Sequence, residues 1–324
     1  MSKYPKSINK ELVNPDPSKE ARGVISYLAD TYGKGILSGQ HEAEFPYRPE
    51  LDRILEVTGK LPAIRSMDFL NYSSAMSWPD DVTERAMDWY LNKGGLVTIC
   101  WHWYSPMGGK PVTKSFYTSQ TDFDIRRLLN KGTPEHAAAM KDMEIVGREL
   151  ARLRDAGVPV LWRPFHEADG AWFWWGAHGP GPCKDLYRLM YERFTYEFKL
   201  NNLIWVWTFA FNELNTDWYP GHDCVDIIGI DKYFPAGDYN PNKEGFEALL
   251  SFGGDIKLIA MTENGPIPDP DLLIGEEAKW LWFCPWFGDF VTDGKCNTPD
   301  HLYKVYNHPY VITLDKLPDL KSYE

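Results

Sequence analysis

Eight short apolar runs alternate with longer amphipathic segments along this chain, and no other feature constrains the fold as strongly. Most of the runs are rich in Val, Ile and aromatic residues, as are strands that are buried on both faces of a parallel sheet. We therefore expect eight strands, at residues 35–41, 61–69, 95–103, 158–166, 202–209, 226–233, 256–263 and 280–286.

Helical periodicity fills several of the segments between these runs. Over residues 134–156 the apolar residues recur at steps of three and four, and Thr133 and Pro134 suit the start of a helix. We expect further helices at about 184–198 and 80–93. The helical pattern is much weaker after the fifth and seventh runs, and nothing in the chain looks like a linker or a repeat.

Polar and aromatic residues gather where six of the runs end. They are Gln40 and His41, Asp68, His102 and Trp103, His166 and Glu167, Asp231 and Tyr233, and Glu263 and Asn264. A doubly wound sheet concentrates its chemistry at one switch point, usually with a glycine-rich loop, and no such loop is found. Residues spread around many strand ends are typical of an α/β TIM barrel. We expect one (β/α)8 domain over residues 1–324, with an N-terminal extension of about 1–17.

The segment around Glu167 carries the clearest chemical signal. Glu167 follows an apolar strand and a His, and residues 172–175 are four aromatic residues in succession. Glycoside hydrolysis needs a carboxylic acid in an apolar pocket that raises its pKa. The structural alternative is an ion pair between Arg163 and Glu167 beside an aromatic core.

A second carboxylate, Glu263, ends the seventh run, whereas Glu167 ends the fourth. Strands four and seven lie on opposite sides of an eight-stranded barrel, so their ends can hold two carboxyl groups across one cleft. A separation of about 5–5.5 Å would give retention of configuration and about 6.5–9.5 Å inversion. The pair predicts a glycoside hydrolase.

The chain resembles glycoside hydrolase family 26, which is typified by endo-β-1,4-mannanases. The resemblance is carried by residues 38–41, 163–176, 226–233 and 263–265, and it continues to Trp286. It implies a retaining enzyme that hydrolyses internal β-1,4 bonds of mannan, glucomannan and galactomannan. It also implies binding of mannooligosaccharides and no cofactor or metal.

The resemblance also assigns roles to single residues. It implies that Glu167 is the general acid/base and Glu263 the nucleophile, with Tyr233 donating a hydrogen bond to Glu263. Substrate contacts are implied for the residues around this pair, with Trp172 stacking a sugar on the leaving-group side and Trp286 forming the floor of the −1 subsite. The implied substrate-binding set is His102, Arg163, His166, Trp172, Asp231, Tyr233 and Trp286.

One position departs from the family pattern. Many family 26 mannanases have Arg after the strand-eight Trp, whereas Phe287 follows Trp286 here. The departure weakens the case for a tight distal minus subsite and favours an endo-acting enzyme whose substrate spreads over several subsites.

Composition excludes several classes of partner. The net charge of −12 argues against nucleic acid and anionic membranes, because polyphosphate binding needs a basic surface. No apolar stretch reaches the length of a membrane span, and residues 1–17 lack the apolar core of a signal peptide. A polymeric substrate nevertheless predicts secretion. We expect a monomer.

Other functions remain open on the sequence. The same machinery would suit mixed-linkage β-glucan or β-1,3-xylan, and a homologue that only binds carbohydrate is a further alternative. His41, His102 and His166 could form a metal site, although the first strand lacks the H-x-H pattern of metallohydrolase barrels. Of the five cysteines, Cys284 and Cys296 are the candidates for a disulfide.

Overall fold

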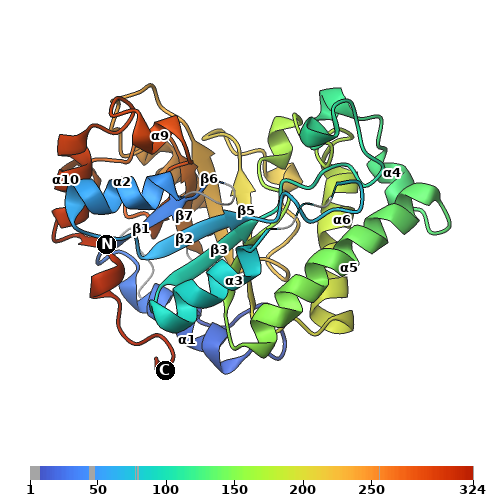
Figure 1. Ribbon diagram of the computed structural model, residues 1–324, viewed down its shortest axis with the longest axis horizontal. Helices are drawn as coiled ribbons and strands as arrows, with labels where there is room; N and C mark the ends of the chain where they lie inside the picture. Colours follow the sequence, from blue (N-terminus) through green and yellow to red (C-terminus); the bar gives the residue numbers. More distant parts are fainter. Residues whose placement is uncertain (1–7, 44–47, 77, 79, 255, 324) are drawn as a thin grey trace.

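Parallel strands form a barrel in the computed structural model, which describes residues 8–43, 48–76, 78, 80–254 and 256–323 (Figure 1). The strands are β1 Ile36–His41, β2 Ile64–Asp68, β3 Leu96–Cys100, β4 Val160–Arg163, β5 Leu203–Phe209, β6 Ile227–Lys232, β7 Leu258–Asn264 and β8 Trp282–Phe283. Each lies within or next to a predicted run, so the prediction of a (β/α)8 barrel is confirmed.

The strands pair in chain order from β1 to β7, and β8 pairs with β1. Backbone hydrogen bonds from Leu281 N to the Ile259 oxygen (2.8 Å) and from Asn264 N to the Cys284 oxygen (3.1 Å) join β8 to β7. The sheet therefore closes on itself, and all eight strands end at the same rim. A short ninth strand, β9 Val311–Ile312, pairs with the start of β1 and was not predicted.

Helices surround the barrel, with α2, α9 and α10 gathered on one side and α4, α5 and α6 on the other (Figure 1). The α-helices are α1 Lys19–Thr31, α2 Pro49–Thr58, α3 Val82–Met87, α4 Ile125–Leu128, α5 Pro134–Asp155, α6 Pro180–Glu192, α7 Lys243–Gly253, α8 Pro270–Gly275, α9 Asp289–Thr292 and α10 Pro299–Asn307. Helix α5 is capped by Thr133, whose side chain accepts a hydrogen bond from His136 N, as predicted.

Two predicted helices continue differently from their patterns. Helix α3 passes into a π-helical turn, η1 Asp88–Asn92, and α6 passes into another, η5 Arg193–Glu197. A π-turn adds one residue to the helical turn, which apolar periodicity alone does not reveal. The helical pattern was weak after the fifth and seventh runs. In the structure only a 3₁₀ turn, η6 Thr216–Trp218, lies between β5 and β6 in the described residues, and the short α8 follows β7.

Tryptophan fills much of the interior. Ten of the 14 tryptophans are less than 2% exposed, among them Trp205 and Trp207 on β5. Trp174 and Trp175 are fully buried, and their indole N–H groups donate to the main-chain oxygens of Trp103 (2.7 Å) and His166 (3.0 Å). Most of the aromatic excess therefore serves the core, while Trp172 is 36% exposed and Trp78 61%.

The proposed disulfide is wrong, because all five cysteines are free and buried. Cys284 follows β8 inside the barrel, where its sulfur lies close to Gly39 of β1. Cys296 lies in the connection before α10, beside Asn297. A buried free thiol behaves as a small apolar side chain, and burial raises the pKa of Cys284 to about 12. In the described part of the chain, no helix has the length and apolar character needed to cross a bilayer.

Candidate active site

Glu167 stands on a tight turn directly after β4. Its backbone φ is +53°, and that of Phe165 is also +53°, values that side-chain-bearing residues rarely adopt. The turn leads into a short 3₁₀ helix, η4 Ala168–Gly170. Such backbone strain costs about 1–3 kcal/mol and clusters at functional sites. The indole of Trp172 donates a hydrogen bond to the Glu167 carboxylate (Nε1–Oε2, 2.8 Å).

Glu263 lies on β7 and is only 4% exposed. Two side chains donate to its carboxylate, the guanidinium of Arg163 to Oε1 and the Tyr233 hydroxyl to Oε2 (2.7 Å). The second contact is the one that was predicted for Tyr233. A register shift between Ile230 and Asp231 on β6 pairs Asp231 directly with Glu263. The shift turns Asp231 toward the same centre.

The two glutamates face each other, together with Asp231. One carboxylate oxygen of Glu167, one of Asp231 and one of Glu263 all lie within 4.8 Å of one another. This spacing belongs with the short separation of retaining glycosidases, because inversion needs about 6.5–9.5 Å to admit a water molecule.

The surroundings of Glu167 and Glu263 differ. Removal from water, and then the negative charge of Glu263, raise the pKa of Glu167 to about 7. Glu263 instead receives two hydrogen bonds, one of them from a cation, and these stabilise its negative charge. Glu167 can therefore hold a proton beside a Glu263 carboxylate that is hydrogen-bonded to Arg163 and Tyr233.

Arg163 lies beneath this pair rather than beside the cleft. It is 2% exposed, and its second nitrogen donates to Asp231 (Nη1–Oδ2, 3.0 Å). The alternative ion pair between Arg163 and Glu167 is not formed, because the guanidinium is directed to β6 and β7. The other Asp231 oxygen accepts a hydrogen bond from the Thr262 hydroxyl (2.7 Å). Arg163 and Asp231, predicted as substrate contacts, are placed to hold Glu263.

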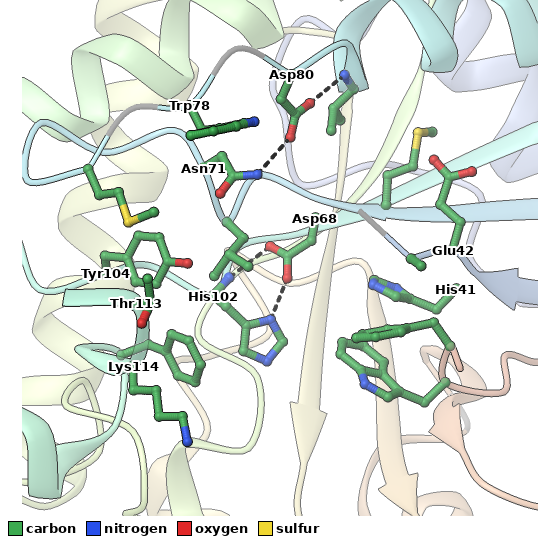
Figure 2. A pocket seen from close by; sticks show the side chains of 18 of the residues that line it. His41, Glu42, Asp68, Asn71, Trp78, Asp80, His102, Tyr104, Thr113 and Lys114 are labelled. Carbon is green, nitrogen blue, oxygen red and sulfur yellow. Dashed lines mark hydrogen bonds and ion pairs between the residues drawn. The ribbon is translucent and has the colours of Figure 1, made fainter. Parts of the chain in front are cut away.

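His102 and His166 join β3 to the turn after β4. Their Nε2 atoms lie 3.0 Å apart, and His102 receives further support from Asp68 at the end of β2. The Asp68 carboxylate accepts hydrogen bonds from His102 Nδ1 (2.5 Å) and from the His102 backbone N–H (2.9 Å). Figure 2 shows this carboxylate directed at the imidazole. Burial lowers the pKa of His102, but the charge of Asp68 and its hydrogen bond outweigh this effect, so the pKa is raised. Asp68 was predicted to lie at a strand end, but its contact with His102 was not predicted.

Trp286 forms an aromatic wall beside this pair of histidines. Its ring stacks on His41 (centroids 3.9 Å apart, 16° between planes) and meets His102 edge to face at 5.5 Å. Beyond Trp286 a pocket of about 530 Å³ opens over the ends of β1, β2 and β3. Tyr104, Trp78, Lys114 and Phe287 line it, the first three labelled in Figure 2. We call it the β1–β3 pocket.

The three histidines do not form a metal site of their own. Among the described residues, the groups whose ligand atoms lie within 4.8 Å of one another are His41–Asp68–Cys100 and Glu167–Asp231–Glu263. His41 is bonded to the Ser66 hydroxyl (2.8 Å), and the guanidinium of Arg163 already supplies positive charge to the acidic group. The nine predicted site residues meet at the barrel rim, around the carboxylates of Glu167 and Glu263.

Comparison with known proteins agrees with this architecture. The model of glycosyl hydrolase family 26 matches residues 13–316. The chain is 41% identical to a mannan endo-1,4-beta-mannosidase of Thermothelomyces thermophilus over 96% of this chain and 64% of the relative. It is 36% identical to mannan endo-1,4-beta-mannosidase B of Piromyces sp over 98% of this chain and 56% of that relative. The chain thus spans between half and two thirds of the length of these curated relatives.

Solved structures give the same result. The GH26-CBM35 beta-(1,4)-mannanase of Podospora anserina superposes with a TM-score of 0.92 at 39% identity, covering 99% of this chain and 72% of that one. A beta-mannanase from a symbiotic protist of the termite Reticulitermes speratus, complexed with a gluco-manno-oligosaccharide, gives 0.87 at 34% identity and covers 96% and 98%. With a family match over nearly the whole chain and two facing glutamates on β7 and after β4, this chain belongs to glycosyl hydrolase family 26.

Proposed function

We propose that this chain is a retaining endo-β-1,4-mannanase that acts on mannan, glucomannan and galactomannan. The observation that carries the proposal is the approach of the Glu167 and Glu263 carboxylates to within 4.8 Å, in surroundings that favour a proton on Glu167. Such a pair performs double displacement at an anomeric carbon.

In the first step, the Glu263 carboxylate attacks C1 of the bound sugar while Glu167 donates its proton to the departing glycosidic oxygen. The C1–O bond to the leaving sugar breaks, and an ester bond between C1 and Glu263 forms. Glu167 is then ionised and accepts a proton from a water molecule, whose oxygen attacks C1 and releases Glu263. Both steps invert at C1, so the configuration is retained.

The walls of the site suit an uncharged polysaccharide. Pyranose C–H faces pack on indole, and Trp172 and Trp286 offer such faces on the two sides of the catalytic pair. Mannan is the substrate in the names of the curated relatives. The β1–β3 pocket adds room beyond Trp286, which supports a substrate that extends over several subsites and hence endo action.

The test is a side-by-side measurement of reducing-sugar release from locust bean gum, lichenan and β-1,3-xylan. We expect the mannan substrate to be cleaved fastest. Faster release from lichenan or xylan would instead favour the glucanase or xylanase alternative, and no release from any of them the alternative of a carbohydrate-binding homologue. We further propose a secreted monomer, because a polymeric substrate is met outside the cell.

The activity is expected to fall as pH rises through about 7. Glu167 must be protonated to act as the acid, so kcat/KM should be high below its pKa of about 7 and decline above it. The hydrogen bond from Trp172 favours the ionised form, and Trp172→Phe should therefore move this decline to higher pH. Profiles of kcat/KM against pH for both proteins measure the effect. If the loss of activity with rising pH were centred below pH 5, Glu167 could not be the acid.

Removing the Tyr233 hydroxyl is expected to slow catalysis without unfolding the protein. Tyr233→Phe keeps the ring but deletes the 2.7 Å hydrogen bond to Glu263. Hydrogen bonds to charged groups contribute about 1.5–3 kcal/mol, so kcat should fall about 10- to 150-fold. Tyr303→Phe, on the exposed face of α10, is the matched control and should leave kcat unchanged. Equal kcat values for both variants would remove Tyr233 from the mechanism.

A further inference from the structure

A second hollow lies where β5 and β6 end. Its volume is about 450 Å³, and Asp169, Phe211, Asn212, Glu213, Lys232 and Glu244 are among its lining residues. We call it the β5–β6 pocket. It shares no lining residue with the β1–β3 pocket.

The barrel places the two pockets on opposite sides of the catalytic pair. Glu167 follows β4 and Glu263 lies on β7, so these strands flank the centre of the rim from opposite sides. The ends of β1–β3 occupy one remaining sector, and the ends of β5 and β6 occupy another. A linear chain whose scissile bond lies between the glutamates can therefore extend toward both pockets.

Phe211 is the aromatic group that connects the β5–β6 pocket to the acid/base. Its ring is 47% exposed and meets Trp172 edge to face, with centroids 5.7 Å apart and 79° between planes. Trp172 in turn donates to Glu167. Two adjoining exposed rings leave apolar surface open to water next to the reacting bond, which is the arrangement that sugar faces fill.

The loop that carries Phe211 is fixed on both sides. The Asp169 carboxylate accepts a hydrogen bond from Ala210 N (2.9 Å), and the Asn212 amide donates to Asn242 (Nδ2–Oδ1, 2.8 Å). Asp169 lies only two residues after Glu167, so the segment that carries the acid/base also holds the loop that carries Phe211. Less conformational freedom is then lost when a ligand binds.

The polar groups of the pocket define the chemistry of its ligand. Glu213 and Glu244 are exposed acceptors, and Lys232 supplies donors, with its Nζ 5.2 Å from the centre of the Phe234 ring. Hydroxyl groups can satisfy both kinds of partner, whereas the excess of carboxylates repels an acidic sugar.

We propose that the β5–β6 pocket is a binding subsite for a neutral hexopyranose unit on the leaving-group side, beyond the unit on Trp172, with Phe211 as its platform. The inference rests on the proposed function. Stacking on Phe211 holds the departing part of the chain, so long substrates gain affinity that short ones cannot.

The experiment compares Phe211→Ala with the wild type on mannohexaose and on an aryl β-mannobioside, whose leaving group ends at the first plus subsite. We expect kcat/KM for mannohexaose to fall about 3- to 10-fold, with a changed distribution of products, and the fall to be absent for the aryl substrate. Phe211→Tyr keeps the ring and should restore the wild-type values. Tyr196→Ala removes an aromatic residue that is 59% exposed on η5 and should change neither substrate.

The possible outcomes separate the two proposals. If the wild type hydrolyses mannohexaose and Phe211→Ala does so at the same rate with the same products, the subsite is wrong and the proposed function stands. An equal fall in kcat/KM on both substrates would mean that Phe211 only positions Trp172, and it would also overturn the subsite. A wild type that hydrolyses neither substrate would overturn the proposed function itself.

Discussion

Replacing Glu263 with alanine is expected to lower kcat on mannan by about 10⁴-fold or more, because the variant cannot form the glycosyl ester. Sodium azide should restore turnover in this variant. The small anion can enter the space of the missing carboxylate and attack C1 from the same face, while Glu167 still protonates the leaving oxygen. The expected product is an α-mannosyl azide, whose inverted configuration is identified by NMR.

Two controls protect this result from a folding artefact. Glu263→Gln keeps the side-chain volume beside Arg163 and should be similarly inactive. Glu197→Ala alters a side chain on η5 that is 63% exposed and should retain full activity. Thermal melts of all three variants report whether the barrel is intact. An azide product with β configuration, or residual activity near that of the wild type in folded Glu263→Ala, would exclude Glu263 as the nucleophile.

Replacing Glu167 with glutamine should have an effect that depends on the leaving group. On mannan, kcat is expected to fall about 10²- to 10⁴-fold, since no proton reaches the departing sugar. A dinitrophenyl β-mannobioside needs no such proton, so its first step should stay fast. Its second step lacks the base that activates water, and the glycosyl enzyme should accumulate.

Stopped-flow measurement of dinitrophenolate release tests this directly. We expect a burst close to one equivalent per enzyme, followed by slow turnover, and mass spectrometry of the quenched protein should show the added disaccharide on Glu263. Similar losses for mannan and for the dinitrophenyl substrate, without a burst, would mean that Glu167 is not the acid/base.

Much of this site could be predicted because strand ends in a closed barrel share one rim. The position of Glu167 after the fourth apolar run and of Glu263 at the end of the seventh was enough to place them across a cleft. The contact from Tyr233 to Glu263 also followed, on the strength of the family resemblance. These predictions depended on the order of the strands, which the alternation of apolar and helical segments reveals.

The partners of Arg163 could not be predicted in the same way. Arg163 is four residues from Glu167 in sequence, which suggested an ion pair between them, but it bonds to residues 68 and 100 positions further along the chain. The choice depends on side-chain direction at the end of β4 and on the register shift before Asp231. Neither leaves a signature in hydrophobic periodicity. The role of Asp68 was missed for the same reason, because only the pairing of β2 with β3 brings it to His102.

The bridge that Arg163 makes between Asp231 and Glu263 has a consequence for the energetics of the whole catalytic cycle. In the proposed mechanism, Glu263 loses its negative charge when it becomes an ester, and Glu167 gains one by giving up its proton. The charge is thus passed between groups whose oxygens lie within 4.8 Å, instead of being created or destroyed in the pocket. Arg163 is also paired with Asp231, so a positive charge is in place beside Glu263 before the reaction begins and little solvent has to reorganise. The negative charge of the site therefore stays constant and only changes its position between Glu263 and Glu167.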